Sequence, residues 1–231
     1  MISLESTYIL IKLIGTKKSN KMNRILTVIL TIGFMSNSFS QGTDRREDFV
    51  FGLKAGTNYS NVWDEQGEDF VADSKFGLAG GAFLGIPLGK YIGLQPEVLL
   101  SQKGFKGTGS IPLVGSYEFT RTTTYLDIPL QVQLKPSEFI TIVAGPQYSY
   151  LLKEKNEFTS GDEIIGNEEE FENDNIRKNT LGVVGGVDIN ISSFVISGRA
   201  GWDLQNNNGD GTTSDPNYKN HWFQLTVGFM F

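Results

Sequence analysis

The stretch HWFQLTVGFMF, residues 221–231, alternates between two sets of side chains. One set consists of Phe223, Leu225, Val227, Phe229 and Phe231, and every member is apolar. The intervening positions are of mixed polarity. A period of two residues is typical of a β-strand, because successive side chains point to opposite faces. The stretch therefore predicts a strand with one wholly apolar face.

Working outward from this strand, the sequence predicts eight antiparallel strands. They span residues 49–62, 75–86, 91–104, 117–134, 139–152, 179–190, 193–204 and 221–231. Short connections at 87–90, 135–138 and 190–193 alternate with long polar ones at 63–74, 105–116, 153–178 and 205–220. This alternation is typical of an all-β, up-and-down antiparallel barrel with tight turns at one rim and loops at the other.

The alternation of apolar and polar residues recurs in the other predicted strands. In 117–134, for example, Leu126, Ile128 and Leu130 alternate with the polar residues Asp127 and Gln131. The pattern fits a soluble barrel with an apolar interior or a membrane barrel with an apolar exterior. Strands of about 10–14 residues are long enough to cross an outer membrane. Aromatic residues also collect near both strand ends, which favours an eight-stranded transmembrane β-barrel in the bacterial outer membrane.

The aromatic residues form two expected girdles. Near the short-turn rim we expect Tyr91, Phe139, Phe194, Phe229 and Phe231. Near the loop rim we expect Tyr59, Tyr148, Tyr150, Trp202 and Phe223. A final aromatic residue after alternating apolar residues is similar to the C-terminal signal of outer-membrane barrels. We therefore expect the barrel-assembly machinery to bind at Phe231.

The N-terminal region predicts export. From Met22 the sequence MNRILTVILTIGFMSNSFSQG has one arginine, an apolar stretch from Ile25 to Met35, and small residues before Gln41. This is the pattern of a secretory signal peptide, and the apolar stretch is about half of the roughly 20 residues that a spanning helix needs. We expect an upstream extension at 1–21, the signal peptide at 22–40 and the barrel domain at 41–231.

Composition argues against several classes of function. The chain has no cysteine, which excludes disulfides, thiolate metal sites and a cysteine nucleophile. Its net charge is −6, and loss of residues 1–40 would make it −10, which argues against nucleic acid as a partner. The one histidine, His221, shares the lipid-facing parity, and no matching Ser or Asp set accompanies it. We expect no enzyme activity, no cofactor and no metal site.

Charged residues on the opposite parity are expected to line the lumen. They are Lys54, Glu97, Lys103, Asp127, Asp188, Arg199 and Asp203. Eight strands leave an interior only just filled by side chains, and an unpaired charge there would be costly. We therefore expect a plugged, ion-paired lumen, with Asp188 and Arg199 facing each other across the hairpin at 190–193. A conducting pore lined by the same charges is the alternative.

Two loops suggest cation binding, but each has a simpler interpretation. Residues 154–175 carry nine acidic residues against one lysine, and a solvated loop is favoured over a cation site. Residues 206–217 begin with the spacing of an EF-hand, but the twelfth position is Asn217 instead of glutamate. A flexible Asn/Gly turn is favoured there.

Three prolines conflict with regular strands. Pro96, Pro129 and Pro146 lie within predicted strands, where the missing N–H removes a hydrogen bond of the ladder. Because a closed barrel offers no edge strand to hold a proline, we expect local bulges at these positions.

Five segments carry a family resemblance. They are FGLKAGTNYSNV (51–62), GLQPEVLLSQKGF (93–105), YLDIPLQVQLK (125–135), VAGPQYSYLL (143–152) and LGVVGGVDINI (181–191). In order and spacing they resemble the PorT-like family of porin-type outer-membrane β-barrels. The resemblance covers nearly all of residues 41–231 and implies an eight-stranded outer-membrane barrel. It carries no catalytic residues, and the long acidic loop departs from it.

Three functions stay open on the sequence. The first is a small barrel with a largely plugged lumen that acts structurally or through extracellular loops, in envelope integrity or partner binding. The second is a narrow porin-like channel for small solutes. The third, an accessory role in protein secretion, is implied by the family resemblance alone. Expected partners are outer-membrane lipid and a protein at the extracellular loops.

Overall fold

The chain was analysed as a computed structural model, which describes residues 44–64, 71–111, 115–160, 163–170, 177–207 and 218–231. The expected extension (1–21) and signal peptide (22–40) lie outside these residues, as does most of the 206–217 loop. Within the described part of the chain, no helix is long and apolar enough to cross a membrane.

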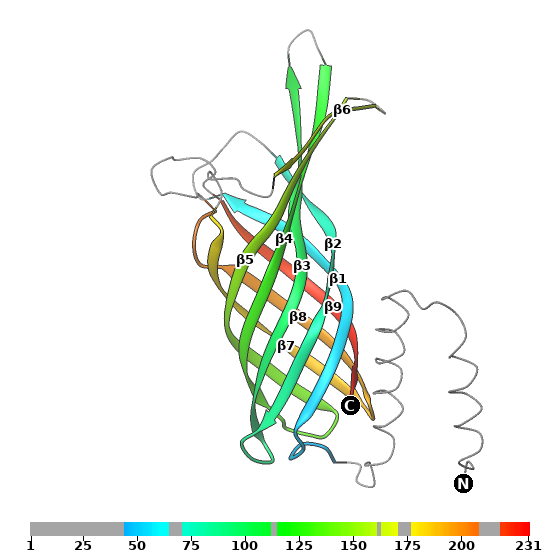
Figure 1. Ribbon diagram of the computed structural model, residues 1–231, viewed down its shortest axis with the longest axis vertical. Helices are drawn as coiled ribbons and strands as arrows, with labels where there is room; N and C mark the ends of the chain where they lie inside the picture. The colour runs from blue at the N-terminus through cyan, green and yellow to red at the C-terminus, as the bar shows by residue number, and fades with distance from the viewer. Residues whose placement is uncertain (1–43, 65–70, 112–114, 161–162, 171–176, 208–217) are drawn as a thin grey trace, which may run out of the picture. The chain divides into compact units, whose positions relative to one another are not determined.

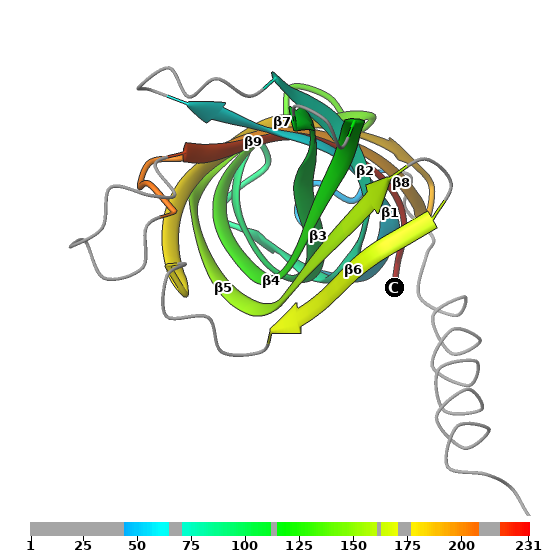
Figure 2. The same ribbon diagram turned by 90° about the horizontal axis from the view of Figure 1, so that it is seen from above.

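Eight antiparallel strands close into a barrel, which confirms the predicted fold class (Figures 1 and 2). They are β1 (Val50–Asp64), β2 (Val71–Pro87), β3 (Ile92–Ile111), β4 (Gly115–Leu134), β5 (Ile140–Ser160), β7 (Asn179–Ile191), β8 (Phe194–Asp203) and β9 (Tyr218–Met230). Each pairs with its neighbours along the chain, and β1 pairs with β9. A further strand, β6 (Glu163–Glu170), pairs with β5 outside the closed ring.

The pairing of β1 with β9 explains the apolar alternation of the last strand. Leu53 lies opposite Phe229 and Thr57 lies opposite Leu225, so that outward residues meet outward residues across the seam. The backbone N–H of Phe231 donates to the carbonyl of Phe51 at 2.8 Å, and the two rings stack with centroids 5.6 Å apart. The seam is thus closed by both ladder hydrogen bonds and ring contacts.

The apolar face of the barrel points outward. Val98, Leu130 and Leu225 are each more than half exposed, whereas Glu97 and Gln131 beside them are buried. A soluble barrel of this size would show the reverse arrangement, because its apolar side chains would fill the interior. The observed arrangement is that of a barrel whose wall faces lipid.

Two strands continue well beyond their predicted ends and β4 begins two residues early, which corrects the expected loops at 105–116 and 153–178. β3 reaches Ile111, β4 begins at Gly115, β5 reaches Ser160, and β6 pairs with the end of β5. Figure 1 shows the resulting sheet standing above the loop rim. These segments, FKGTGSI at 105–111 and KEKNEFTS at 153–160, contain few apolar residues, so no apolar period marks them as strands. Backbone ladders hold them, helped by surface ion pairs such as Lys106–Glu118 at 2.8 Å.

The expected bulges at the three prolines are wrong. Around Pro96, Phe83 still pairs with Glu97 and Ile86 with Leu94, so the register of β2 and β3 is the same on both sides. The register is also unbroken at Pro129 and Pro146. Each proline therefore interrupts the ladder locally without inserting a residue, because the adjoining pairs and the other neighbouring strand keep the register.

The bulges lie elsewhere, and one of them requires glycine. The register of β2 and β3 shifts between Ser74 and Ala79, close to Gly104 on β3. Gly104 has a φ of 145°, and a Cβ at this position would lie 2.0 Å from the carbonyl oxygen of Arg121. Both the backbone conformation and the contact with β4 exclude a side chain.

Replacing Gly104 with alanine is expected to lower the free energy of unfolding by about 1–3 kcal/mol, because the strained backbone and the clash must be relieved by local distortion. Gly198→Ala is the matched control, since a Cβ at Gly198 would meet no atom within 4 Å. Urea unfolding of both variants in detergent micelles would measure the difference. Equal midpoints for the two variants would contradict the assigned bulge.

Candidate functional site

The inward side of the barrel wall is polar, and the strands bring its charged side chains together. All seven residues proposed from the sequence to line the lumen are buried there, with exposed fractions between 1% and 5%. They are Lys54, Glu97, Lys103, Asp127, Asp188, Arg199 and Asp203. Strand alternation places each one inward, because side chains separated by an even number of residues on a strand point to the same face.

The layer nearer the short turns contains four charges that pair completely. Arg199 contacts Asp188 through two nitrogens, Nη1 to Oδ1 at 2.7 Å and Nη2 to Oδ2 at 3.0 Å. Its Nη2 also lies 3.6 Å from Oε1 of Glu97, whose Oε2 pairs with the ammonium group of Lys54. Two cations and two carboxylates thus form one chain that crosses from β1 through β3 and β8 to β7, and its net charge is zero.

Glutamines complete this layer. Arg199 Nε donates to Oε1 of Gln131 at 3.1 Å, and Gln95 Nε2 donates to Oε1 of Glu97 at 2.7 Å. Gln133 in turn donates to Oε1 of Gln95. Sequence reasoning placed Gln95, Gln131 and Gln133 on the polar face but assigned them no role. Because buried charges are stable only when their remaining hydrogen-bonding capacity is satisfied, these amides belong to the same site.

A second layer lies toward the loop rim. The Lys103 ammonium group lies 3.1 and 3.2 Å from the two carboxylate oxygens of Asp127. It also lies 3.8 Å from a ring centroid of Trp222 and 4.9 Å from that of Tyr125, so that aromatic faces cover it. Asp203 accepts a hydrogen bond from Asn220 Nδ2 at 2.7 Å.

A third layer, beyond the first two, was missed from the sequence. Arg121 Nε lies 2.9 Å from Oε1 of Glu154, and its Nη1 donates to the hydroxyl of Tyr218 at 2.9 Å. Glu154 is only 1% exposed, which corrects its expected place in the solvated acidic loop. The register of β4 and β5 shifts between Thr124 and Tyr125, so that the inward residues of β5 change from odd-numbered up to Leu151 to even-numbered beyond it, which turns Glu154 inward. The inward parity of Arg121 on its predicted strand was the signal that could have found this layer.

The aromatic residues proposed as girdles lie on the outward face. Eight of them are between 38% and 59% exposed: Tyr59, Tyr91, Phe139, Tyr148, Tyr150, Phe194, Trp202 and Phe223. Phe229 and Phe231 are half-buried by ring contacts with their neighbours, including each other at 5.2 Å. Their outward orientation is the one that girdle residues require, and their location at the lipid–water boundary stays a prediction.

The fold, the outward apolar band and the polar lumen agree with one protein family. A family model described as "Outer membrane protein beta-barrel domain" matches residues 39–209, well over half of the chain. The chain belongs to this family. It is therefore an outer-membrane β-barrel protein of the bacterial envelope. The match does not distinguish the PorT-like branch from other members of the family.

Solved structures similar to this outer-membrane barrel share little sequence with it. Ail of Yersinia pestis, solved in complex with the heparin analogue sucrose octasulfate, is 12% identical, with a TM-score of 0.45 over 79% of this chain and 99% of Ail. Neisserial surface protein A is 12% identical, with a TM-score of 0.46 over 78% of this chain and 97% of its own. OprG of Pseudomonas aeruginosa is 11% identical, with a TM-score of 0.35 over 79% and 95%. No curated protein matches the chain.

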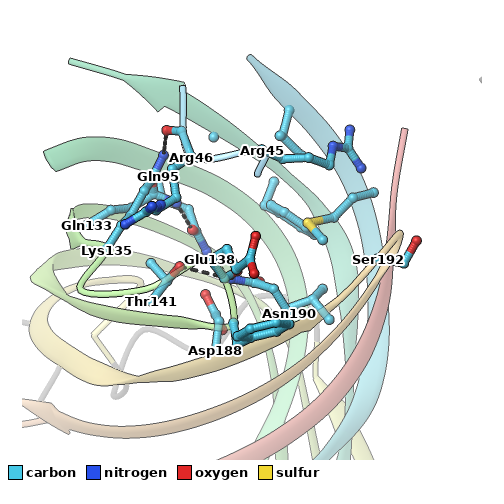
Figure 3. Close-up of a pocket in the computed structure, with 16 residues that line it drawn as sticks. Arg45, Arg46, Gln95, Gln133, Lys135, Glu138, Thr141, Asp188, Asn190 and Ser192 are labelled. Carbon is cyan, nitrogen blue, oxygen red and sulfur yellow. Dashed lines mark hydrogen bonds between the residues drawn. The ribbon is translucent and has the colours of Figure 1, made fainter. Parts of the chain in front are cut away.

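A cavity of about 80 Å³ opens at the short-turn rim of the outer-membrane barrel (Figure 3). Its floor includes Asp188 of the first charge layer, and the segment before β1 lies across it. Lys135 Nζ donates to the carbonyl of Arg46 at 2.8 Å, and Arg45 Nη2 donates to the carbonyl of Phe231 at 2.9 Å. These two hydrogen bonds hold the segment over the rim of the lumen.

Electrostatics at this rim follow from the same contacts. Burial lowers the pKa of Lys135, which donates to a backbone carbonyl, and the carboxylates of Asp48 and Asp44 oppose this shift in part. The Arg46 guanidinium, hydrogen-bonded to Asp44 at 2.7 and 2.8 Å, holds the pKa of the Asp44 carboxyl well below its ordinary value. The rim segment therefore stays charged but internally paired at neutral pH.

The remaining candidate residues of the outer-membrane barrel lie apart from the lumen charges. His221 faces outward near the loop rim, opposite Trp202 of β8 and Asn61 of β1. Most of the acidic stretch at 154–175 has no described side chains, and the EF-hand-like spacing falls almost wholly outside the described residues. In the part of the chain that the structure describes, no group of three or more His, Asp or Glu side chains could hold a metal ion.

Proposed function

We propose that this outer-membrane barrel is closed to solutes and acts at its surface, in envelope integrity or in binding a partner. The observation that carries the proposal is the first charge layer. Lys54, Glu97, Arg199 and Asp188 join strands on opposite sides of the lumen, and every one of them is at most 4% exposed. An ion-paired chain across an eight-stranded barrel leaves little room for a solute.

The second and third layers reinforce this closure. Lys103 is held between Asp127 and two aromatic rings, and Arg121 is held between Glu154 and Tyr218. A solute would have to break several buried charge-assisted hydrogen bonds in sequence. Each such break leaves a buried charge without its partner, which is strongly unfavourable.

Planar bilayer recording tests the proposal. The purified barrel is expected to give no discrete conductance, whereas a variant with Asp188→Ala and Arg199→Ala is expected to conduct. The double change removes one charge of each sign and leaves Lys54 paired with Glu97, so the remaining layer stays neutral. Stable unitary steps from the unmodified protein would instead make it a channel.

The surface available for a partner is the sheet that extends beyond the loop rim. It consists of the ends of β3, β4 and β5 together with β6, and it continues the barrel wall (Figure 1). The sequence of β6, EIIGNEEE, contains four glutamates. Their charge suits a partner with a basic surface and disfavours nucleic acid.

A narrow channel for small solutes is the alternative function. The polar lumen and the cavity of about 80 Å³ at the short-turn rim favour it, because water can enter at least that end. The resemblance to PorT-like barrels adds a role beside a secretion system. Co-purification of secretion components with the barrel from membranes would support that role over the other two.

Export and assembly complete the proposal. Residues 22–40 would direct the chain to the envelope as a signal peptide, and the barrel-assembly machinery would recognise the last strand through Phe231. The outward apolar band, with residues such as Leu130 and Val98 about half exposed, supports lipid as the surrounding medium.

A further inference from the structure

The second charge layer carries one carboxylate too many. Lys103 is its single cation, and Asp127 and Asp203 are its two carboxylates. The first layer and the Arg121–Glu154 pair each contain equal numbers of cations and carboxylates. Within the described residues, Asp203 is therefore the lumen charge without an oppositely charged partner.

Asp203 is well placed to need a ligand. It is 5% exposed, and its Oδ1 has no hydrogen-bond partner, while Oδ2 accepts from Asn220. Lys103 attracts the carboxylate electrostatically, but its ammonium group is already bound to both oxygens of Asp127. A buried carboxylate whose hydrogen bonds come only from the neutral residue Asn220 is far from compensated. A water molecule could fill the free hydrogen-bonding position, but it could not neutralise the charge.

Two buried hydroxyl groups without hydrogen-bond partners lie on strands near Asp203. The Tyr125 hydroxyl is buried without a hydrogen-bond partner and lies beside Asn220 and the Asp203 carboxylate. Gly182 lies opposite Asp203 on β7, where a Cβ would lie 2.7 Å from the carbonyl oxygen of Trp202 and 3.4 Å from Asp203 Oδ1. Thr180 Oγ1, on the same inward face of β7, is also buried and unpartnered. One buried carboxylate oxygen and two buried hydroxyl groups at this end of the lumen thus have no hydrogen-bond partner.

We propose that Asp203 binds a small monovalent cation of the sodium class at the loop end of the lumen, with the Tyr125 hydroxyl as a neutral ligand. A single positive charge brings the layer to neutrality. A divalent cation would overcompensate it, would meet repulsion from Lys103, and would lack the several carboxylates that such ions prefer. Because Asp203 is the last residue of β8, the ion would enter from the loop rim.

Cation-specific stabilisation tests this site. The intact barrel in detergent is unfolded with urea in sodium chloride and in N-methylglucamine chloride at equal ionic strength. We expect a higher midpoint in sodium, because an ion that binds only the folded state stabilises it. Calcium chloride at the same ionic strength should give no further gain. Equal midpoints in sodium and N-methylglucamine, or a larger gain in calcium, would overturn the proposal.

Three variants locate the effect. Asp203→Asn, which keeps the shape and removes the charge, is expected to abolish the sodium-specific shift. Asp127→Asn should abolish it as well, because Lys103 then becomes free to neutralise Asp203. Glu118→Gln, at an exposed ion pair outside the lumen, should leave the shift unchanged. A shift that persists in Asp203→Asn would contradict the assignment.

A direct measurement of ion binding keeps the proposal testable even if a variant fails to fold. Sodium-23 NMR line broadening by the folded barrel, reversed by Asp203→Asn, would demonstrate binding without reference to stability. Absence of broadening in the unmodified barrel, together with an unfolding midpoint that depends on pH but not on sodium, would show that Asp203 is neutralised by a proton.

Discussion

Replacing Arg199 with methionine is expected to lower the free energy of unfolding by about 3–5 kcal/mol, the cost of leaving a buried charge unpaired. Asp188 would lose both of its ionic contacts, at 2.7 and 3.0 Å, and Gln131 would lose its donor. Glu97 would keep Lys54, so the damage is concentrated at Asp188. Urea unfolding and refolding in lipid vesicles, followed by tryptophan fluorescence, would measure the change.

The double variant Arg199→Met with Asp188→Asn is the control for this prediction. It removes both charges of the pair, and methionine retains much of the apolar volume of arginine. Buried ion pairs replaced as a unit are often neutral in stability, so most of the loss should be recovered. A single variant as stable as the parent protein would show that water reaches Asp188, and the closed lumen would then be wrong.

An arginine in place of Leu130 should destabilise the inserted barrel by about 2–4 kcal/mol, because the side chain would face the middle of the bilayer. Leu130 is the middle residue of the outward apolar run Leu126, Ile128, Leu130, Val132 and Leu134 on β4, and it is 51% exposed. Leu134 is the matched control. It lies at the end of the same strand, also faces outward and is 50% exposed.

The comparison between Leu130→Arg and Leu134→Arg separates the effect of depth in the bilayer from the effect of the arginine side chain itself. Near the interface the same substitution is expected to cost only about 0–1 kcal/mol, since the guanidinium reaches water and headgroups. Folding into vesicles under reversible conditions would give both values. Equal costs at the two positions would show that the strand does not span the bilayer as placed here.

Strand alternation made most of the fold predictable. Where one face is apolar, as in β9 with Phe223, Leu225 and Val227, the period of two residues reveals both the strand and its orientation. The extensions of β3, β4 and β5 lack that contrast, because their sequences contain few apolar residues. Their ladders depend on backbone pairing, which leaves no mark on composition, and so the sequence predicted loops there.

The charged residues of the lumen followed from parity, but their partners did not. Parity places Lys103 and Asp127 inward without saying which cation meets which carboxylate. The pairing of cations with carboxylates depends on the register between strands that are distant in the sequence. Glu154 shows the limit most clearly, because its dense acidic context suggested solvent, while the register of β5 turns it onto Arg121. The predicted bulges at the prolines were wrong for a related reason. The residue pairs on either side of each proline keep the strands in register, although the proline itself donates no hydrogen bond.

The sheet that rises above the loop rim also has a mechanical meaning. From Phe105 to Ile111, β3 alone adds roughly 20 Å of strand at the usual rise per residue. Its hydrogen-bonded ladder with β4 runs unshifted from Ile92 to Ile111, without a hinge between tip and wall. A pull on the tip would therefore be transmitted as shear along the ladder into the membrane-embedded wall. A partner bound at the tip would be held at a fixed distance from the lipid surface.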